Sequence, residues 1–338
     1  MKESELLENL KQNPFVLAPM AGITDRPFRS FMRELGCGIV VTELVSATGL
    51  RYSPEKTRRL MEFDSSQSPV GIQLFGENLE HLSEAARVVE DMGADFVDLN
   101  FGCPVPKVVS RGAGSACLKD LNRLRDTIRA VKSSVAIPVT IKIRTGWDHA
   151  ARNSHEVVQI AHDEGVTWVA IHGRTRAAGY SGLADWDYIR DVKASSPIPI
   201  LGNGDITSAE LAIGRLRDSK CDGVMIGRGC LKNPRIFIEA NGLSSTSEVA
   251  KHDLTGILRN LHQHLETFYD ERLTLIQMRK FASWYSSGFP GAATFRKEIF
   301  QTNEKTETLN RINDFFGSMA EAIPADTSAE PFLMGGHG

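Results

Sequence analysis

Short apolar runs rich in β-branched residues recur along the first two thirds of the chain. Each run is almost continuously hydrophobic, and this pattern predicts strands that are buried on both faces, as in a parallel sheet. There are eight such runs: PFVLAPM from residue 14, GIVVTEL from 38, VGIQLFG from 70, ADFVDLN from 94, PVTIKIR from 138, TWVAIHG from 167, IPILGNG from 198 and DGVMIGRG from 222.

Amphipathic segments separate these runs. Residues 78–93 and 120–134, for example, carry apolar side chains at helical spacing, which predicts helices packed on a sheet. Eight βα units in about 225 residues predict an α/β fold, the (β/α)8 TIM barrel. A doubly wound sheet would show fewer strands and a GxGxxG turn after the first one. The glycine-rich residues 112–117 (GAGSAC) follow the fourth strand and lack that spacing, so we exclude this alternative.

The strand pattern stops near residue 240. A polar stretch, SSTSEV at 244–249, then leads into two amphipathic segments at 251–273 and 273–300, which predict a small helical domain. The last residues are rich in Pro and Gly without periodicity, which predicts disorder. We therefore divide the chain into an N-terminal extension (1–13), a barrel (14–243), a helical domain (244–319) and a disordered tail (320–338).

Composition narrows the class of protein. The chain has 338 residues, of which 41% are hydrophobic and 24% are charged, as in an ordinary globular protein. It begins with a charged segment instead of an apolar signal core, and it has no run near the roughly 20 apolar residues of a membrane span. We predict a cytoplasmic protein without membrane contact. A net charge of −3 means that any nucleic acid would be met by a local basic face.

The five cysteines show neither CxxC pairs nor Cys/His clusters at zinc-finger spacing. The sequence therefore predicts no metal site and no disulfide framework. Cys103 lies between Gly102 and Pro104, directly after the fourth strand. Such a thiol can pack as a small hydrophobe, ligate a metal or act on a substrate, and the spacing alone does not decide between these roles.

Polar residues close nearly every apolar run. In a TIM barrel the chemistry lies at the C-terminal ends of the strands, so these residues are the first candidates for a site. They are Met20, Glu43, Gln73, Asn100, Lys142, Arg144, His172, Arg174, Asn203, Asp205 and Arg228.

Each candidate also has a structural interpretation. Gln73 and Asn100 could hydrogen-bond the loop backbone, and His172 could be a buried core histidine. Lys142 favours function more strongly, because an ammonium at the end of a buried strand needs an anion or a shifted pKa. Arg174 and Arg176 lie beside His172 and also suggest an anion nearby.

Glycine-rich turns follow the last two strands, at GNGD (202–205) and GRG (227–229). This is where TIM barrels commonly bind a phosphate, with backbone N–H groups as donors and Arg228 as an added charge. Glycines also make tight βα turns, but together with Lys142 and His172 they favour a phosphate-bearing cofactor. Flavin mononucleotide (FMN) fits a barrel of this size.

Several of these segments together resemble one family. LAPMAGITDRPFR (17–29), DLNFGCPVPKVVSRGAGSACL (98–118), VTIKIRTGW (139–147) and VAIHGRTRAAGYSG (169–182) are similar to the tRNA-dihydrouridine synthases, which depend on FMN and NADPH. The resemblance runs over residues 14–240 and continues at 278–292 (MRKFASWYSSGFPGA). Bacterial subgroup B is the most similar.

The resemblance implies a role for individual residues. Cys103 matches the general acid of the NxGCP motif, and Asn100 matches a residue that meets the target uracil. Pro19, Met20 and Gln73 match contacts of the isoalloxazine ring, Lys142 its N1/O2 edge and His172 the flavin site. The residues that match the ribityl-phosphate end are Asn203, Gly204, Asp205, Gly227 and Arg228. Phe281 departs from the family pattern, where a histidine is expected.

A tRNA partner also requires cations on the surface. We predict phosphate contacts from the barrel rim and from the helical domain. The rim candidates are Lys107, Arg111, Arg144, Arg174 and Arg176, and those of the helical domain are Arg279, Lys280, Arg296 and Lys297. We expect Trp284 and Tyr285 to be core residues and not base-stacking ones.

The implied reaction reduces the C5–C6 double bond of a uridine in tRNA, with NADPH as the reductant. Hydride passes from flavin N5 to C6, and Cys103 gives a proton to C5. Two alternatives remain open at this point. One is an FMN oxidoreductase of a free pyrimidine, like dihydroorotate dehydrogenase, and the other is a tRNA-binding protein without catalysis. We expect a monomer, and the motifs do not predict which uridine is modified.

Overall fold

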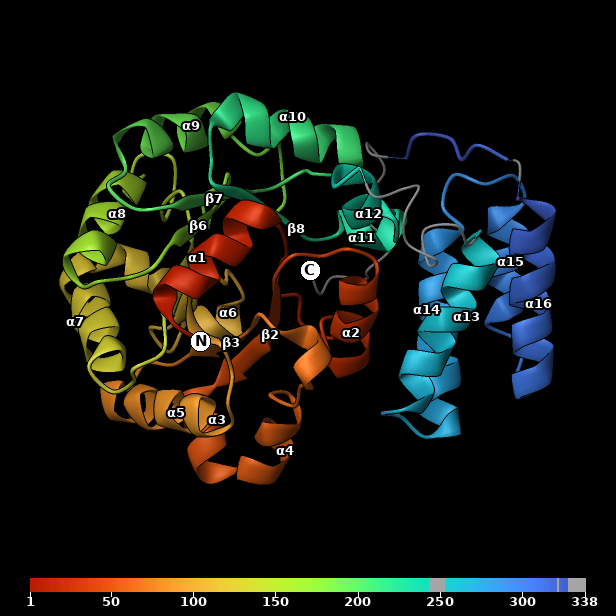
Figure 1. The fold of residues 1–338 in the computed structure, drawn as a ribbon, viewed down its shortest axis with the longest axis horizontal. Coiled ribbons are helices and arrows are strands. Elements are labelled where there is room, and N and C mark those ends of the chain that lie inside the picture. The colour runs from red at the N-terminus through yellow and green to blue at the C-terminus, as the bar shows by residue number, and fades with distance from the viewer. Residues whose placement is uncertain (243–252, 321, 328–338) are drawn as a thin grey trace.

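Eight parallel strands form a barrel (Figure 1) in the computed structural model, which describes residues 1–242, 253–320 and 322–327. The strands are β1 (Phe15–Leu17), β2 (Val40–Ser46), β3 (Val70–Phe75), β4 (Phe96–Phe101), β5 (Val139–Arg144), β6 (Val169–His172), β7 (Ile200–Asn203) and β8 (Gly223–Ile226). The ladder runs β1-β8-β7-β6-β5-β4-β3-β2. Between β1 and the start of β2, Val16 bridges to Ile39, and the Leu17 N–H donates to the Ile39 carbonyl at 2.9 Å. This confirms the predicted TIM barrel.

Helices alternate with the strands and form the outer layer seen in Figure 1. Those of the barrel are α2 (Arg26–Glu34), α3 (Ala47–Tyr52), α4 (Pro54–Arg59), α5 (Leu79–Asp91), α6 (Pro106–Val109), α7 (Leu121–Lys132), α8 (Ser154–Asp163), α9 (Trp186–Ser195), α10 (Ala209–Ser219), α11 (Gly229–Lys232) and α12 (Ile236–Ala240), with 3₁₀ turns η1 (Ser65–Gln67) and η2 (Gly114–Lys119). Asp25, Asn78, Asp120 and Ser208 cap four of them, each by accepting a backbone N–H of the first turn.

The interior of the barrel is filled by side chains and is not a pore. Phe96 and Trp168 meet edge to face there, with ring centroids 5.3 Å apart. Gly71 on β3 leaves the space for this pair, because a Cβ at that position would lie 2.2 Å from the Phe96 ring. The large aromatic residues therefore pack where a neighbouring strand carries no side chain.

The predicted N-terminal extension is a helix, α1 (Glu3–Gln12), that crosses the barrel in Figure 1. Leu6 and Leu10 on this helix are fully buried among the interior residues. A Cβ at Gly223, where β8 begins, would lie 2.9 Å from Leu10 Cδ1. The helix therefore closes the N-terminal end of the barrel and leaves the C-terminal end as the mouth.

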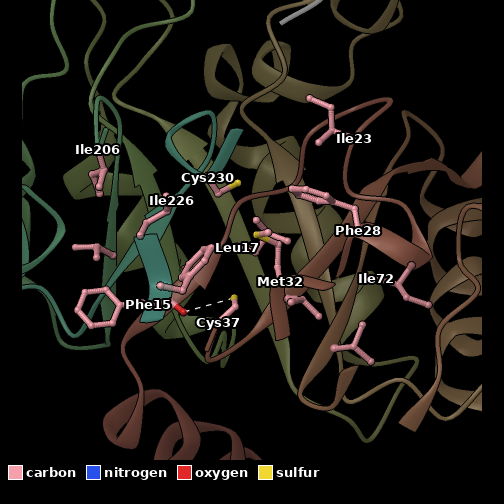
Figure 2. Packing of buried hydrophobic residues seen from close by; sticks show 14 of the residues in the cluster. Phe15, Leu17, Ile23, Phe28, Met32, Cys37, Ile72, Ile206, Ile226 and Cys230 are labelled. Atoms are coloured by element: carbon pink, nitrogen blue, oxygen red, sulfur yellow. Dashed lines mark hydrogen bonds between the residues drawn. The ribbon is translucent and has the colours of Figure 1, made fainter. Parts of the chain in front are cut away.

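A second cluster of buried side chains fills the space between strands and helices, as Figure 2 shows around Phe15 and Met32. Cys37 belongs to it, and its thiol lies 3.2 Å from the Ile39 carbonyl and 3.7 Å from that of Phe15. Burial raises the pKa of this thiol to about 12. All five cysteines are free, and four of them are buried; only Cys103 is partly exposed.

Four further helices form the C-terminal region: α13 (Leu254–Glu266), α14 (Glu271–Tyr285), α15 (Ala292–Ile299) and α16 (Lys305–Ser318). Phe281 on α14 stacks on Phe28 of α2, with centroids 5.1 Å apart and an interplanar angle of 8°. Both rings are buried, so an apolar contact joins this region to the barrel. Trp284 and Tyr285 are buried as well, which confirms the prediction that they belong to the core.

Parts of the predicted domain division lie outside the described residues. These parts are the linker at 244–249, the boundary at 243/244 and most of the tail from residue 328. Within the described part of the tail, the Ala325 N–H donates to the Gly288 carbonyl at 2.9 Å. The predicted disorder of residues 320–338 stays a prediction. In the described ranges no helix has the length and apolar character that a membrane crossing requires.

Candidate functional site

Strand register brings the polar candidates to one level of the barrel mouth. Asn100 is the Cα partner of Lys142, and Arg144 is the partner of His172. His172 in turn pairs with Asn203 on β7. Residues far apart in the sequence thus form a continuous arc from β4 to β7.

A chain of amide side chains supports the loop that carries Cys103. The Asn100 Oδ1 accepts the N–H of Cys103 at 2.9 Å and that of Gly102 at 3.2 Å. The Asn100 Nδ2 donates to Gln73 Oε1 at 2.7 Å, and Gln73 Nε2 donates to Asp98 at 2.6 Å. Gln73 is buried in this network and does not line the cavity described below. Asn100 therefore hydrogen-bonds loop backbone next to the thiol, as its structural interpretation predicted, and Gln73 supports Asn100. Their contacts to flavin and uracil stay predictions.

The GAGSAC segment holds the same loop from the other side. Ser115 donates both its N–H (3.1 Å) and its hydroxyl (2.9 Å) to the Cys103 carbonyl. Gly114 has a φ of +60°, and a Cβ there would lie 2.9 Å from that carbonyl oxygen. Glycine is required at this position both for its backbone angle and for the close approach. The GAGSAC segment, which lacks the spacing of a nucleotide-binding turn, therefore supports the loop that carries Cys103.

The Cys103 thiol is half-buried, and this desolvation raises its pKa above the ordinary value. Arg144 and Lys142 act in the opposite direction, but burial is the larger effect. The group is therefore a protonated thiol near neutral pH, and it is close enough to both cations for them to influence its titration.

Lys142 is the cation at the centre of the arc. Burial, helped by the nearby Arg144, lowers its pKa to about 8, while Asp98 and Cys103 oppose the shift. Its Nζ donates to Asn203 Oδ1 at 3.2 Å, and Asn203 Nδ2 donates to the Met225 carbonyl at 2.7 Å. At pH 7 the ammonium is mostly charged, and no carboxylate within the described residues pairs with it directly.

Two arginines expected on the rim are buried instead. Arg144 donates to the carbonyls of Gly102 (3.0 Å), Thr175 (2.9 Å) and Gly179 (2.7 Å). Arg174 donates to the carbonyls of residues 181 and 182 and pairs with Asp205 at 2.8 Å. Both side chains tie mouth loops together, and neither presents the exposed guanidinium that a phosphate grip on the surface requires.

His172 is buried beside these cations. Burial lowers its pKa well below 6.5, and Arg144 and Lys142 add to the shift, so the ring is neutral. Its Nε2 lies 3.4 Å from Arg174 Nη1, which can only donate. The Nε2 therefore accepts, and the ring proton is on Nδ1.

A cavity of about 740 Å³ opens on the β5 to β8 side of the mouth. Its wall contains nine of the ten predicted cofactor residues: Pro19, Met20, Lys142, His172, Asn203, Gly204, Asp205, Gly227 and Arg228. Of the predicted RNA residues only Arg174 reaches it, and Cys103 and Asn100 lie outside its lining.

The turn after β7 shapes this cavity. Gly204 has a φ of +126°, and a Cβ there would lie 2.6 Å from the Ala184 Cβ and 3.0 Å from His172 Cδ2. Asp205 also has a positive φ of 52°, and its carboxylate accepts from Arg174 and from the Ala184 N–H at 2.7 Å. The turn is therefore fixed by its own ion pair, and glycine at 204 permits its close packing against Ala184 and His172.

Tyr180 is a cavity residue to which the sequence analysis gave no role. Its ring lies 4.4 Å from the Arg228 guanidinium carbon and 5.6 Å from that of Arg144. Gly179 and Gly182, both with positive φ, flank it. This pair of glycines around an aromatic residue, beside the HGRTR motif, is the signal that could have identified it. Thr207, Arg215 and Lys232 also line the cavity and were not predicted.

The other predicted RNA residues lie in different environments. Lys107, Arg111 and Lys297 are exposed, whereas Arg279 and Arg296 are partly buried. Lys280 faces the barrel, where its Nζ donates to the Gly22 carbonyl at 3.2 Å. Glu43, another strand-end candidate, accepts the N–H of the same Gly22.

A family model described as dihydrouridine synthase (Dus) matches residues 16–320. The chain belongs to the dihydrouridine synthase family. It is therefore an enzyme, a flavin-dependent oxidoreductase, as the resemblance implied.

Curated relatives in this family match over nearly the whole chain. tRNA-dihydrouridine synthase B of Pseudomonas syringae pv. tomato is 38% identical over 309 residues, which cover 90% of this chain and 91% of that protein. A probable tRNA-dihydrouridine synthase of Rickettsia conorii is also 38% identical and covers 90% of this chain and 94% of its own length. The synthase B of Xanthomonas axonopodis pv. citri is 36% identical over 91% of this chain and 94% of its own. Subgroup B is thus well represented among the relatives of this family member.

Solved structures share the fold at low identity. Histamine dehydrogenase from Rhizobium sp. 4-9 superposes with a TM-score of 0.52 and 14% identity, covering 73% of this chain and 49% of that one. A 2-naphthoyl-CoA reductase gives 0.51 and 13% over 70% of this chain and 51% of its own. This chain spans about half the length of those proteins, and the likeness shows the fold alone.

Proposed function

We propose that this family member reduces the C5–C6 double bond of specific uridines in tRNA, with bound FMN as cofactor and NADPH as reductant. The observation that carries the proposal is the barrel mouth, where a loop-supported Cys103 thiol lies near Lys142, which lines a cationic cavity. Relatives that are 38% identical carry the name tRNA-dihydrouridine synthase. That name supplies the substrate class for the proposal.

The residues present suit a flavin mononucleotide. The turn at Gly204 and the charge of Arg228 lie in the same cavity wall, and together they suit a phosphate. Lys142, Met20 and Pro19 line the same cavity, where the lysine would supply a positive charge to a flavin ring and the other two an apolar wall. Bound FMN supplies the hydride that adds to C6 of the uracil.

Cys103 supplies the matching proton. Its thiol is the neutral acid at physiological pH, so it can protonate C5 without a preceding change of state. The resulting thiolate is stabilised by Lys142 and Arg144 until it takes a proton from water. Asn100 and Ser115 hold the backbone on either side, which fixes the direction of the thiol.

Lys142 supplies electrostatic stabilisation. The ammonium is partly desolvated without any ligand, and this burial lowers its pKa to about 8. An anion that binds beside it recovers this cost, because opposite charges attract more strongly away from water. The lysine therefore favours the anionic form of a ligand at this edge of the cavity.

The remaining parts of the chain would serve the RNA. A stacked uridine cannot reach a thiol inside a barrel mouth, so the enzyme has to turn the base out. We assign residues 14–243 to catalysis and 244–319 to tRNA binding, with 1–13 as the helix that closes the barrel and 320–338 as a tail. A monomer suffices for this arrangement.

The direct test is dihydrouridine measured by mass spectrometry, mapped by position, in tRNA from a synthase-deficient strain. The tRNA is incubated with the protein, FMN and NADPH, with Cys103→Ala in parallel. We expect product at a defined position, reduced at least about 100-fold by the variant, since a general acid contributes that much. Reduction of the flavin by NADPH should be unchanged in Cys103→Ala.

Two results would redirect the proposal. A flavin-loaded, NADPH-reducible protein that makes no dihydrouridine but turns over orotate or dihydroorotate would be a free-pyrimidine oxidoreductase. A protein that binds tRNA and supports its folding equally well with Cys103→Ala would be a binding protein without catalysis.

A further inference from the structure

Two cations of the barrel rim lie over the same aromatic ring. Lys119 Nζ lies 4.8 Å from the centroid of the Trp147 indole, and the Arg176 guanidinium carbon lies 4.4 Å from it. Lys119 ends η2, Trp147 follows β5 and Arg176 follows β6. Three loops of the mouth therefore meet at this indole, which we call the rim triad: Lys119, Trp147 and Arg176.

The backbone that carries the indole is fixed by hydrogen bonds to the loop of Arg176. The Arg176 N–H donates to the Gly146 carbonyl and the Ala177 N–H to the Trp147 carbonyl, both at 2.9 Å. Gly146 has a φ of +157°, and a Cβ there would lie 2.2 Å from the Ala151 carbonyl oxygen. The position of Trp147 thus rests on a glycine that nothing else can replace.

The two charges of the rim triad have no counter-charge in the part of the chain that the structure describes. Neither Lys119 nor Arg176 forms an ion pair there, and the buried Arg176 Nε has no hydrogen-bond partner. The nearest acids in the sequence, Asp120 and Asp148, accept backbone N–H groups. Because each cation is less than 5 Å from one centroid, the two lie within about 10 Å, the Debye length at 0.1 M salt. Like charges held this close repel unless an anion joins them.

The rim triad is also connected to the loop that carries Cys103. It stands on η2, whose Ser115 holds the Cys103 carbonyl. On the other side, Arg144 links the carbonyl of Thr175, directly before Arg176, to that of Gly102. An anion bound at the rim triad would therefore contact the two segments that hold the Cys103 loop, η2 and the loop after β6.

We propose that the rim triad binds consecutive phosphates of an RNA strand beside the active site, with Trp147 as the residue that positions the two cations. This rests on the proposed tRNA substrate and adds Lys119 and Trp147 to it. Exposed Lys107 lies on α6, which contacts η2, and exposed Arg111 follows two residues after the end of that helix.

The test is the salt dependence of binding of an unmodified tRNA transcript to the flavin-loaded protein. We expect Lys119→Gln and Arg176→Gln each to weaken binding several-fold and to lower the slope of log K against log salt by about 0.7–0.9. Trp147→Leu should weaken binding with an unchanged slope, because both charges remain. Lys11→Gln, on α1 at the closed end of the barrel, is the matched control and should change neither quantity.

Intrinsic fluorescence gives a second measurement. Trp168, Trp186 and Trp284 are buried, so a fluorescence change on adding RNA should come from Trp147 and disappear in Trp147→Leu.

The outcomes separate this inference from the proposed function. If wild type makes no dihydrouridine yet its RNA affinity depends on Lys119 and Arg176, the rim triad stands and the reaction is wrong. If dihydrouridine forms but both glutamine variants keep the wild-type salt slope, the rim triad is only a clamp between loops and the inference is overturned. Failure of wild type to bind the transcript overturns both.

Discussion

The two halves of the barrel mouth are built from different kinds of residue. The β3 to β4 half is built mainly from neutral groups: Asn100 and Ser115 hydrogen-bond the loop of Cys103, and Gln73 hydrogen-bonds Asn100. The β5 to β8 half is built from cations and glycines around a cavity of about 740 Å³. The β3 to β4 half fixes the position of the Cys103 thiol, and the β5 to β8 half forms a cationic cavity for a ligand.

The two halves also differ in how their buried polar groups are satisfied. Amide hydrogen bonds are satisfied inside the protein, so the thiol loop is complete without a ligand. Lys142 has no direct carboxylate partner in the described residues, and burial lowers its pKa to about 8. A bound anion would therefore stabilise the cationic half more than the amide half.

Removing the central charge tests the cationic half most severely. We expect Lys142→Met to lower kcat for dihydrouridine formation by about 10²–10³-fold, because a preorganised charge is lost. The wild-type rate should also fall as pH rises through about 8, where Lys142 loses its proton, and the variant should lack this step. Lys193→Met, which breaks a pair with Asp222 at the other end of the barrel, is the control. A variant with a normal rate at pH 7 would contradict the assigned role.

A single methyl group tests the amide half. Gly114→Ala places a Cβ 2.9 Å from the Cys103 carbonyl oxygen and should lower kcat by roughly 10–100-fold through misplacement of the thiol. Gly93→Ala is matched, since Gly93 has a similar φ of +79° and open space around it. Both variants should lose about 1–2 kcal/mol of stability in denaturant unfolding. Equal activities of the two variants would show that the loop is not fixed by this contact.

A smaller change tests the ion pair in the turn after β7. Asp205→Asn keeps a residue that accepts positive φ but removes the charge that holds Arg174. We expect FMN to bind about tenfold more weakly in a fluorescence titration, with kcat at saturating FMN nearly unchanged. Asp187→Asn, on the exposed face of α9, should leave the affinity as it is. Loss of kcat instead of affinity would place Asp205 in the other half of the comparison.

Much of the fold could be predicted because buried parallel strands have a plain signature. The run PVTIKIR contains β5, and the ends of the runs gave Lys142, His172 and Asn203 as mouth residues. The helix α1 was missed, although Leu6 and Leu10 are spaced for one buried face. The charges around them argued only against an apolar signal core, and residues 1–13 were assigned as an extension without a predicted helix.

The environment of the arginines could not be predicted. Arg144 and Arg174 follow strands in the same way as Lys142, but their partners are loop carbonyls. The direction of a carbonyl depends on loop dihedral angles, and residue types do not encode these unless a glycine or proline forces them. Phe281 was likewise noticed only as a departure, because its partner Phe28 is about 250 residues away in the chain.

The stack of Phe281 on Phe28 has a mechanical consequence. Together with the bond from Lys280 to Gly22, it ties the described C-terminal helices to the barrel through two contacts of α14. If the proposed tRNA substrate binds across this junction, a misfit would fall on the nucleic acid. Substrates with a pliable elbow near the target nucleotide would be favoured over rigid helices, so the enzyme would choose among RNAs partly by their elasticity.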